Sequence, residues 1–441
     1  MNTVSSKRAR VYRFLRRNLS KRGWDFSEIP DKRQQKKVKH SLNSIVWAIL
    51  WGLIGNRRTL RDVEEMTQSL GPWASQHVPE PISDTTLDTE ARRLDQDALH
   101  NQLIQQIRDW HRAKMLKPCQ LPTGIVTIDG KNLATVSHDA QGSAHQRSSE
   151  TAKWAKAGST DASYYLMPAL RATLTSAEAK PAIFQLPLPP GTGESTSLRP
   201  FVQQLDDAYG QSHLFDILDM DAGLTSLENA NAIHSYGYQY IFGLKENQPL
   251  LLQQAQSVLL PRTYQTAPNA QTDWECRNGK KIRRQLWRTS HVNGFETSAG
   301  RWTHLTQIWL VVQETQHPNG TIDIEDRYFL TSIPWHRFTP SQILLAVRNH
   351  WAVENDTFNS LDLQWREDHG PWCTRGKAVW SLGVLRLMAY NVVQFLRKRH
   401  LKQRNAKGQW LKHLRWRSMF EILRDVIKGF TCIDEAIAPN V

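Results

Sequence analysis

The feature that most constrains the fold of this chain is a short apolar run closed by an aspartate. Residues 125–128 (IVTI) have the length and composition of a buried strand, and Asp129 follows them directly. A carboxylate in this position is held rigidly at the edge of a sheet, where a metal ion can reach it. Asp-Gly is also among the commonest turn dipeptides, so Asp129-Gly130 on its own permits a plain turn.

Two further acids occupy comparable positions. Residues 217–220 form a second apolar run, in which Asp219 and Asp221 would point to the same side of the strand. Glu354 lies in a predicted helix, 341–361, whose apolar residues recur at helical spacing. Three carboxylates of this kind suit a two-metal site for phosphoryl transfer, because two Mg²⁺ or Mn²⁺ ions about 3.5–4 Å apart prefer oxygen ligands.

The pattern along the chain predicts three regions. Residues 1–115 show helical periodicity near 7–20, 34–55, 59–70 and 86–115, with Thr59 as a plausible N-cap. Residues 120–400 alternate strands and helices, which indicates an α/β fold with a mixed sheet. A β-rich segment at about 265–335, with the hairpin turn Pro318-Asn319-Gly320, interrupts this alternation. Residues 401–441 form a basic tail. Predicted strands are 124–129, 169–174, 182–186, 214–220, 238–244, 283–290, 303–314 and 326–333, and the last predicted helices are 341–361 and 377–399.

Basic residues concentrate at both ends of the chain, whose formal net charge is +14. Residues 1–40 hold 13 Lys and Arg against 3 Asp and Glu, and residues 391–420 hold 9 Lys and Arg and no acid. The remainder is slightly acidic. This distribution favours DNA-contacting arms around a metal-binding body over a uniformly solvated basic surface.

Cysteine usage and hydropathy exclude other classes of protein. The four cysteines are scattered without a C-x-x-C spacing, which argues against zinc and for reduced thiols in a cytoplasm. The apolar stretch 45–54 has ten residues, too few to span a bilayer that needs about 20. We therefore expect a buried helix there and no membrane segment.

Seven strings of the chain, taken in order, resemble a known family. They are NRRTLRD (56–62), TIDGK (127–131), DA (221–222), YIFGLKENQP (240–249), RYFLTS (327–332), HWAVEN (350–355) and LDLQWRED (361–368). No single string is specific, but the ordered set covers most of the chain. It is similar to the DDE transposases of bacterial insertion sequences, nearest to the H repeat-associated group.

The resemblance implies a fold and a reaction. The fold would be α/β, an RNase H-like core with an inserted β-rich segment, behind an all-α N-terminal domain that binds DNA. The reaction would be metal-dependent DNA nicking and strand transfer, with Asp129, Asp221 and Glu354 as both catalytic residues and metal ligands. The family places its second acid directly before alanine, which selects Asp221 over Asp219. The string at 223–226 departs from the family, as do Val347 and Leu361 beside Glu354.

Several cations are candidate DNA contacts. They are Lys131, Lys245, Arg348, His350, Arg397, Lys398, Arg399 and Lys402. His350 lies one helical turn before Glu354, so a contact with the catalytic acids or a core position beside Trp351 is also open. Trp410 and Trp416 are candidates for stacking on bases. Glu367-Asp368 is a reserve carboxylate pair, expected to support the site or to lie on the surface.

The partners implied are double-stranded DNA, both transposon ends and target, and a second copy of the chain, as a homodimer or larger oligomer. Two alternatives remain open at this point. One is a metal-dependent nuclease without strand transfer, and the other is a decayed transposase that only binds DNA. The three acids alone do not separate the first alternative from strand transfer, because both reactions use the same site.

Overall fold

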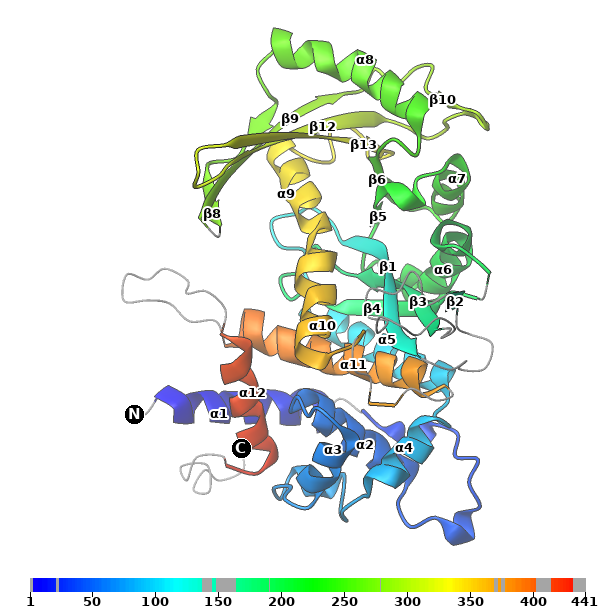
Figure 1. Ribbon diagram of the computed structural model, residues 1–441, viewed down its shortest axis with the longest axis vertical. Helices are drawn as coiled ribbons and strands as arrows, with labels where there is room; N and C mark the ends of the chain where they lie inside the picture. Colours follow the sequence, from blue (N-terminus) through cyan, green and yellow to red (C-terminus); the bar gives the residue numbers. More distant parts are fainter. Residues whose placement is uncertain are drawn as a thin grey trace, which may run out of the picture.

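The computed structural model describes residues 3–20, 24–136, 145–147, 164–189, 191–277, 279–368, 372–373, 377–401 and 414–430. These residues form a mixed α/β structure in which one large sheet follows an N-terminal helical region, as the sequence predicted (Figure 1). Most of the loop expected at 137–160, and most of the expected basic tail, lie outside the described residues.

The N-terminal helices begin where polar side chains cap them. They are α1 (Thr3–Leu15), α2 (Leu42–Ile54), α3 (Leu60–Thr67), α4 (Asp84–Ala91) and α5 (Gln96–Arg112). Thr59 and Asp62 form a reciprocal capping box at α3, which confirms Thr59 as its N-cap. The prediction of a helix from residue 34 was wrong, because Ser41 caps α2 by accepting from the backbone of Ser44. The single helix predicted over 86–115 is two, because Asp95 caps α5.

The centre of the large sheet consists of three neighbouring parallel strands. Strand β1 (Ile125–Val136) pairs in parallel with β5 (Ile217–Met220), which pairs in parallel with β6 (Gln239–Leu244). On its other side β1 pairs antiparallel with β3 (Tyr164–Thr173), which also pairs with β2 (His145–Arg147) and β4 (Ala182–Pro187). Helices α6 (Glu194–Tyr209) and α7 (Leu227–Ser235) make the connections on either side of β5.

The β-rich segment continues the same sheet rather than forming a separate one. Strand β13 (Ile322–Thr331) pairs antiparallel with β6, and β12 (Gln307–Gln316), β9 (Lys280–Thr289) and β7 (Ala270–Gln271) follow outward. The predicted turn at Pro318-Asn319-Gly320 joins β12 to β13, and Gly320 there has a φ of 86°. Strands β8 (Glu275–Arg277), β10 (Glu296–Thr297) and β11 (Gly300–Arg301) are short. Helix α8 (Pro249–Gln265) was not predicted, although Pro249 at its start is a helix signal.

One long helical stretch crosses the face of the sheet beside β1. It runs as α9 (Pro340–His350), a π-helical turn η8 (Val353–Phe358) and α10 (Asn359–Trp365), where a single regular helix was predicted. The apolar residues of α9 pack in one cluster with Ile125, Ile217 and Ile241 of the three parallel strands. This packing fixes the stretch that carries Glu354 over the ends of β1 and β5.

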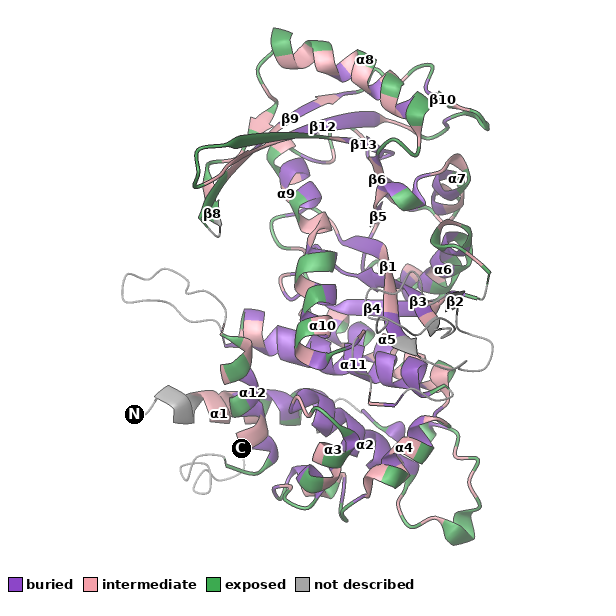
Figure 2. Cartoon of the chain, viewed as in Figure 1, coloured by how far each residue is buried: buried purple, intermediate pink, exposed green. Residues whose placement is uncertain are grey.

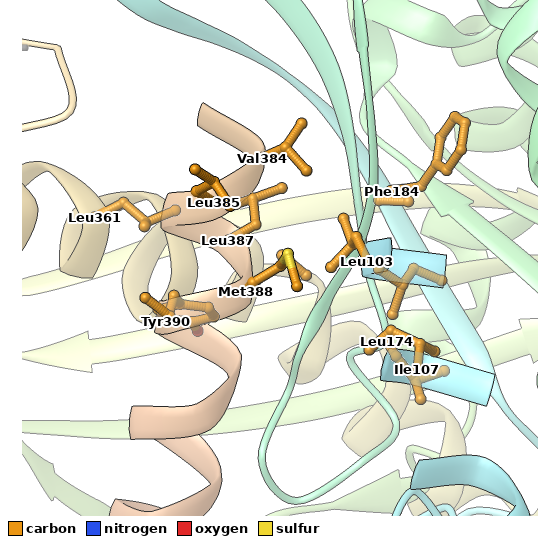
Figure 3. Packing of buried hydrophobic residues seen from close by; sticks show 14 of the residues in the cluster. Leu103, Ile107, Leu174, Phe184, Leu361, Val384, Leu385, Leu387, Met388 and Tyr390 are labelled. Carbon is orange, nitrogen blue, oxygen red and sulfur yellow. The ribbon is translucent and has the colours of Figure 1, made fainter. Parts of the chain in front are cut away.

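Helix α11 (Ala378–Phe395) is the centre of the main core. All of its residues are buried (Figure 2), and Figure 3 shows Leu385 and Met388 among side chains that include Leu103 and Ile107 of α5. By length and composition, Ala378–His400 is apolar enough to cross a membrane, which the sequence analysis overlooked. Its apolar window is wholly buried inside the fold, as in a core helix. The last described helix is α12 (Trp416–Ile427).

Gly124 gives a test of this packing. A Cβ there would lie 2.2 Å from the carbonyl oxygen of Leu214 and 2.7 Å from Cα of Phe215, whereas a Cβ on Gly193 would meet nothing within 4 Å. We expect Gly124→Ser to lower the free energy of unfolding by about 1–3 kcal/mol, because the backbone before β5 must move. Gly193→Ser, at the N-cap of α6, should cost nothing. Equal thermal unfolding midpoints for the two variants would contradict this account.

Candidate active site

Three separate elements bring the predicted acids together. Asp129 lies in β1 and Asp221 caps the turn after β5, and because Ile128 and Met220 are register partners in these parallel strands, both acids follow at the same level of the sheet. Glu354 lies in the π-helical turn η8. The charges of Asp221 and Glu354 both act on Asp129. Residues separated by 92 and 133 positions in the sequence are therefore neighbours in space.

Electrostatic repulsion is concentrated on Asp129. The pKa of Asp129 is raised to about 7. Burial raises it most, and the negative charges of Asp221 and Glu354 raise it further, whereas His350 and the backbone N–H of Gly130 lower it. Within the described ranges, no three His, Cys, Asp or Glu side chains are close enough to hold a metal ion jointly. The carboxylates are thus near enough to repel one another but are not closed around a single point.

Asp219 and Asp221 differ sharply in their surroundings. Asp219 is buried, and its Oδ2 accepts a hydrogen bond from Thr127 Oγ1 at 3.1 Å and lies 3.0 Å from His350 Nδ1. Asp221 is partly exposed, and its Oδ1 accepts from the backbone N–H of Gly223 at 3.0 Å. An acid that already bonds two buried groups is a poor ligand, so these contacts favour Asp221.

His350 faces inward. Its ring pairs with Asp219 and meets Trp351 edge-on, with centroids 5.7 Å apart. Burial by itself would lower the pKa of His350, but the charge and hydrogen bond of Asp219, with smaller contributions from Asp129 and Asp221, outweigh it and the pKa is raised. Among the roles left open by the sequence, contact with the acids agrees best with this geometry, and we no longer expect a direct DNA contact.

A fourth acid, Glu194, lies beside these residues and was not predicted from the sequence. It is the first residue of α6, and its carboxylate lies so close to Gly130 that a Cβ on Gly130 would fall 1.9 Å from Oε1. Burial, and then the charge of Asp221, raises the pKa of Glu194. Glutamate in the first turn of a helix is common, so nothing in the sequence singled it out.

A pair of cations holds the Glu354 helix on the sheet. Lys131, two residues beyond Asp129, pairs with Asp362 of α10. Phe358, the last residue of η8, lies under both Lys131, at 5.7 Å from ring centroid to Nζ, and Arg171, at 5.5 Å to Cζ. Lys131 was predicted to meet a DNA phosphate. Its ammonium group instead has an internal partner, and we infer that it holds the helix in place.

Glu367 is buried rather than exposed. Its two carboxylate oxygens accept from both terminal nitrogens of Arg171 at 2.9 Å each, and Nη1 of Arg386 lies 3.9 Å away. Arg171 is the register partner of Asp129 across β1 and β3. Burial alone would raise the pKa of Glu367, but Arg171 and then Arg386 outweigh it and lower the pKa. Of the two positions expected for Glu367, the structure excludes the surface one and agrees with the supporting one. The sequence could not decide between them, because Arg171 is 196 residues from Glu367.

The other predicted DNA contacts divide into two groups. Lys245 and Arg348 are exposed, and Arg348 pairs with Glu275 at 2.6 Å. Near Lys245, Asn247 and Gln248 donate to the carbonyls of Ala222 and Thr225, so they support the turn that carries Asp221.

The C-terminal cations have partners within the protein. Arg397 donates to the carbonyl of Leu414 at 2.8 Å and stacks on Trp416. Lys398 is buried, and its ammonium group lies 2.8 Å from a carboxylate oxygen of Asp356. Arg399 donates to the carbonyl of Met115. We no longer expect Lys398 to contact DNA, since removing it from Asp356 would leave a buried charge unpaired. Trp416 packs against Trp365 and Phe420 rather than facing outward. Lys402 and Trp410 lie outside the described residues.

The buried cluster predicts a contrast between two variants. Glu367→Gln leaves the buried Arg171 without its counter-charge and should lower the free energy of unfolding by about 3–5 kcal/mol. Arg386→Met should cost far less, because no nitrogen of Arg386 makes a hydrogen bond within the described structure and Arg171 still neutralises Glu367. Urea unfolding of both variants measures the difference. A milder effect for Glu367→Gln than for Arg386→Met would show that the cluster has been misread.

Comparisons with known proteins agree with this arrangement. Residues 121–392, which include all three acids, match the family described as Transposase DDE domain, and residues 25–107 match the DDE_Tnp_1-associated family. The protein YbfL of Escherichia coli (strain K12) is 23% identical over 381 residues, covering 83% of this chain and 88% of YbfL. The resemblance expected from the sequence is confirmed: this chain belongs to the Transposase DDE domain family.

Proposed function

We propose that this transposase nicks DNA at the ends of an insertion sequence and transfers the freed strand to a target. The observation that carries the proposal is the placement of the acids: Asp129 and Asp221 come one residue along from register partners in adjacent parallel strands, and Glu354 is near enough to add to the charge on Asp129. Like charges gathered from three elements repel unless a cation offsets them. A site built only for stability would not gather unpaired acids in this way.

An RNase H-like core is part of the proposal. The strand order β4, β3, β1, β5, β6 supports it, with antiparallel pairing up to β1 and parallel pairing from β1 to β6. In this arrangement Asp129 lies in β1, just past its parallel pairing with β5, and Asp221 follows β5 directly. The third acid then arrives on a helix, after the inserted strands have extended the sheet.

Asp129, Asp221 and Glu354 would hold two Mg²⁺ or Mn²⁺ ions. The donor set suits such ions, because all three groups are carboxylates, whose oxygens these ions prefer as ligands. Bound divalent ions activate an attacking oxygen and stabilise the leaving one. The glutamate's exposure leaves it free to move toward the other two acids when charge is supplied.

The proposed reaction needs no covalent bond to the protein. In the first step the oxygen of water bonds to the phosphorus at the transposon end, and the bond from phosphorus to the 3′-oxygen breaks. In the second step this 3′-hydroxyl bonds to a target phosphorus and displaces the target's own 3′-oxygen. The chain contributes position: Asp219 holds His350 beside the acids, and the turn braced by Asn247 fixes Asp221.

The partners follow from this reaction. Double-stranded DNA is the proposed substrate, both as transposon end and as target, and two ends in one complex imply at least a homodimer. A cytoplasmic, nucleoid-associated location is proposed with them. Hydrolysis without strand transfer is separated from this proposal by offering a pre-cleaved end, because only a transposase joins its 3′-hydroxyl to a second duplex.

Glu354→Gln tests the chemistry. The change keeps the size of the side chain but removes the charge, so Mg²⁺-dependent nicking of an end-containing duplex should fall by at least about a hundredfold while DNA affinity stays within about twofold. The matched control is Glu228→Gln, an exposed glutamate on α7, which should nick at the wild-type rate. Wild-type nicking by Glu354→Gln would remove Glu354 from the site.

Asp129→Asn tests the repulsion and the metal separately from activity. Because the pKa of Asp129 is raised to about 7 in the folded protein, the folded state holds this proton more tightly than the unfolded chain does. Wild-type stability should therefore fall as the pH rises from about 4 to about 7, and Asp129→Asn should escape this loss. At about pH 8, Mg²⁺ should raise the unfolding temperature of the wild type more than that of the variant. Equal Mg²⁺ shifts would count against metal binding at Asp129.

A further inference from the structure

The N-terminal helical region contains a groove that lies away from the acids. It measures about 1220 Å³ and lies between the segment 30–40 and the residues around the start of α4, with Lys377 before α11 also lining it. Figure 1 shows the 30–40 segment, in blue, looping away from the helices beyond α11, while β1 and β5 lie on the other side of α11. The groove is therefore separate from the candidate active site.

Two of the three acids that line this groove are paired with arginines, and the third accepts a hydrogen bond from the backbone. Asp31 accepts from Arg33 at 2.8 and 2.7 Å, and this hydrogen bonding lowers the pKa of Asp31 to about 2. Glu90 lies 3.7 Å from Arg33 and 3.3 Å from Arg93. Glu64 accepts from the backbone N–H of Asp84 at 3.0 Å. Arg33 thus links the segment 30–40 to Glu90 of α4 and holds one side of the groove in place.

Four lysines remain unpaired in the groove. Lys32, Lys37, Lys39 and Lys377 line it, all four are exposed, and their ammonium groups make no ion pair within the residues that the structure describes. Unpaired ammonium groups around an open groove attract a polyanion. Its volume exceeds the roughly 300–1,000 Å³ of most small-molecule sites, which favours a polymer as the ligand.

We propose that this lysine groove (Lys32, Lys37, Lys39 and Lys377) binds the phosphate backbone of DNA. The proposal rests on the proposed function, in which DNA is the substrate, and adds where the helical region holds it. Ammonium groups act on phosphates as point charges, whereas the reading of guanine edges typically uses the fork of arginine. The arginines here are engaged with Asp31, Glu90 and Asp88. The groove therefore positions the duplex and does not read its sequence.

The test compares two fourfold Lys→Gln variants of the full chain. One carries the change at Lys32, Lys37, Lys39 and Lys377. The control carries it at four exposed lysines outside the groove, Lys114, Lys117, Lys281 and Lys428, so the two variants have the same net charge. Fluorescence anisotropy with a labelled end-containing duplex gives the affinity at a series of KCl concentrations, and thermal unfolding checks that both variants fold.

The groove variant should flatten the slope of log Kobs against log[KCl] by about 3.6, since each of the four lost phosphate contacts removes about 0.9, and should bind at least about tenfold more weakly. The control should change the slope by about 1 at most. Lys→Arg at the four groove positions should restore binding, because either cation neutralises a phosphate. A groove variant that matches the control overturns the inference, as does a loss of affinity for an RNA duplex or an acidic peptide without a loss for DNA.

Failure of the inference and failure of the proposed function give different results. If the wild-type chain binds and nicks the duplex but the groove variant keeps the control's salt slope, only the groove assignment falls. If the wild-type chain neither binds nor nicks the duplex, the proposed function itself fails. Glu354→Gln in the same assay should keep the wild-type slope, because its site lies beyond α11 from the groove.

Discussion

The attachment of one helix to one pair of strands is the interaction on which the site depends. Lys131 and Arg171 lie in β1 and β3, near Asp129. Between them they bind Phe358 and Asp362 of the helical stretch that carries Glu354, and Glu367 in the turn that follows it. The three candidate acids repel one another, so no attraction among them brings the stretch to the sheet. Apolar packing of α9 at one end and two ion pairs at the other must do so. A buried pair such as Arg171–Glu367 adds little net stability, because desolvation offsets its attraction, but it allows only one arrangement of its partners.

The π-helical turn η8 contains both Glu354 and Phe358, the aromatic residue that packs against Lys131 and Arg171. Helix α9 packs against apolar residues of the sheet, whereas α10 contacts Lys131 of β1 through Asp362. The π-helical turn η8 lies between the two helices, with Glu354 in its first turn. A π turn adds a residue to the helical register and often occurs at functional sites, because it lets one side chain leave the regular spacing. Here it lets Phe358 face the two cations while Glu354 remains exposed near Asp129.

Local patterns in the sequence predicted what depends on neighbouring residues. The apolar runs before Asp129 and Asp221 are strands, Thr59 caps a helix, and Pro318-Asn319-Gly320 is a hairpin turn, because each needs only adjacent side chains and backbone preferences. The predicted strands in 283–333 likewise exist, but their joining to β6 is a pairing over a long separation and has no local signal. The same reason explains why Arg171, Arg386 and Glu194 were missed: each acts through a partner far away in the sequence. The π turn was missed because its residues have ordinary helical periodicity.

The basic residues show how far a charge count can lead. In the C-terminal basic run, Arg397, Lys398 and Arg399 bind backbone carbonyls, an aromatic ring and the partly exposed carboxylate of Asp356, so these three cations have partners within the described fold. At the N-terminal end, Arg33 likewise pairs with an internal partner, Asp31, whereas the lysines of the groove make no such pair among the described residues. A cation that is already paired with an internal partner neutralises no phosphate when DNA binds. The salt-dependent part of the affinity therefore comes from the unpaired cations. The roles that we assign to the basic residues therefore follow from pairing rather than from composition: Lys131, Arg171 and Lys398 have partners inside the fold, and the exposed lysines beyond α11 are the ones that we propose bind DNA.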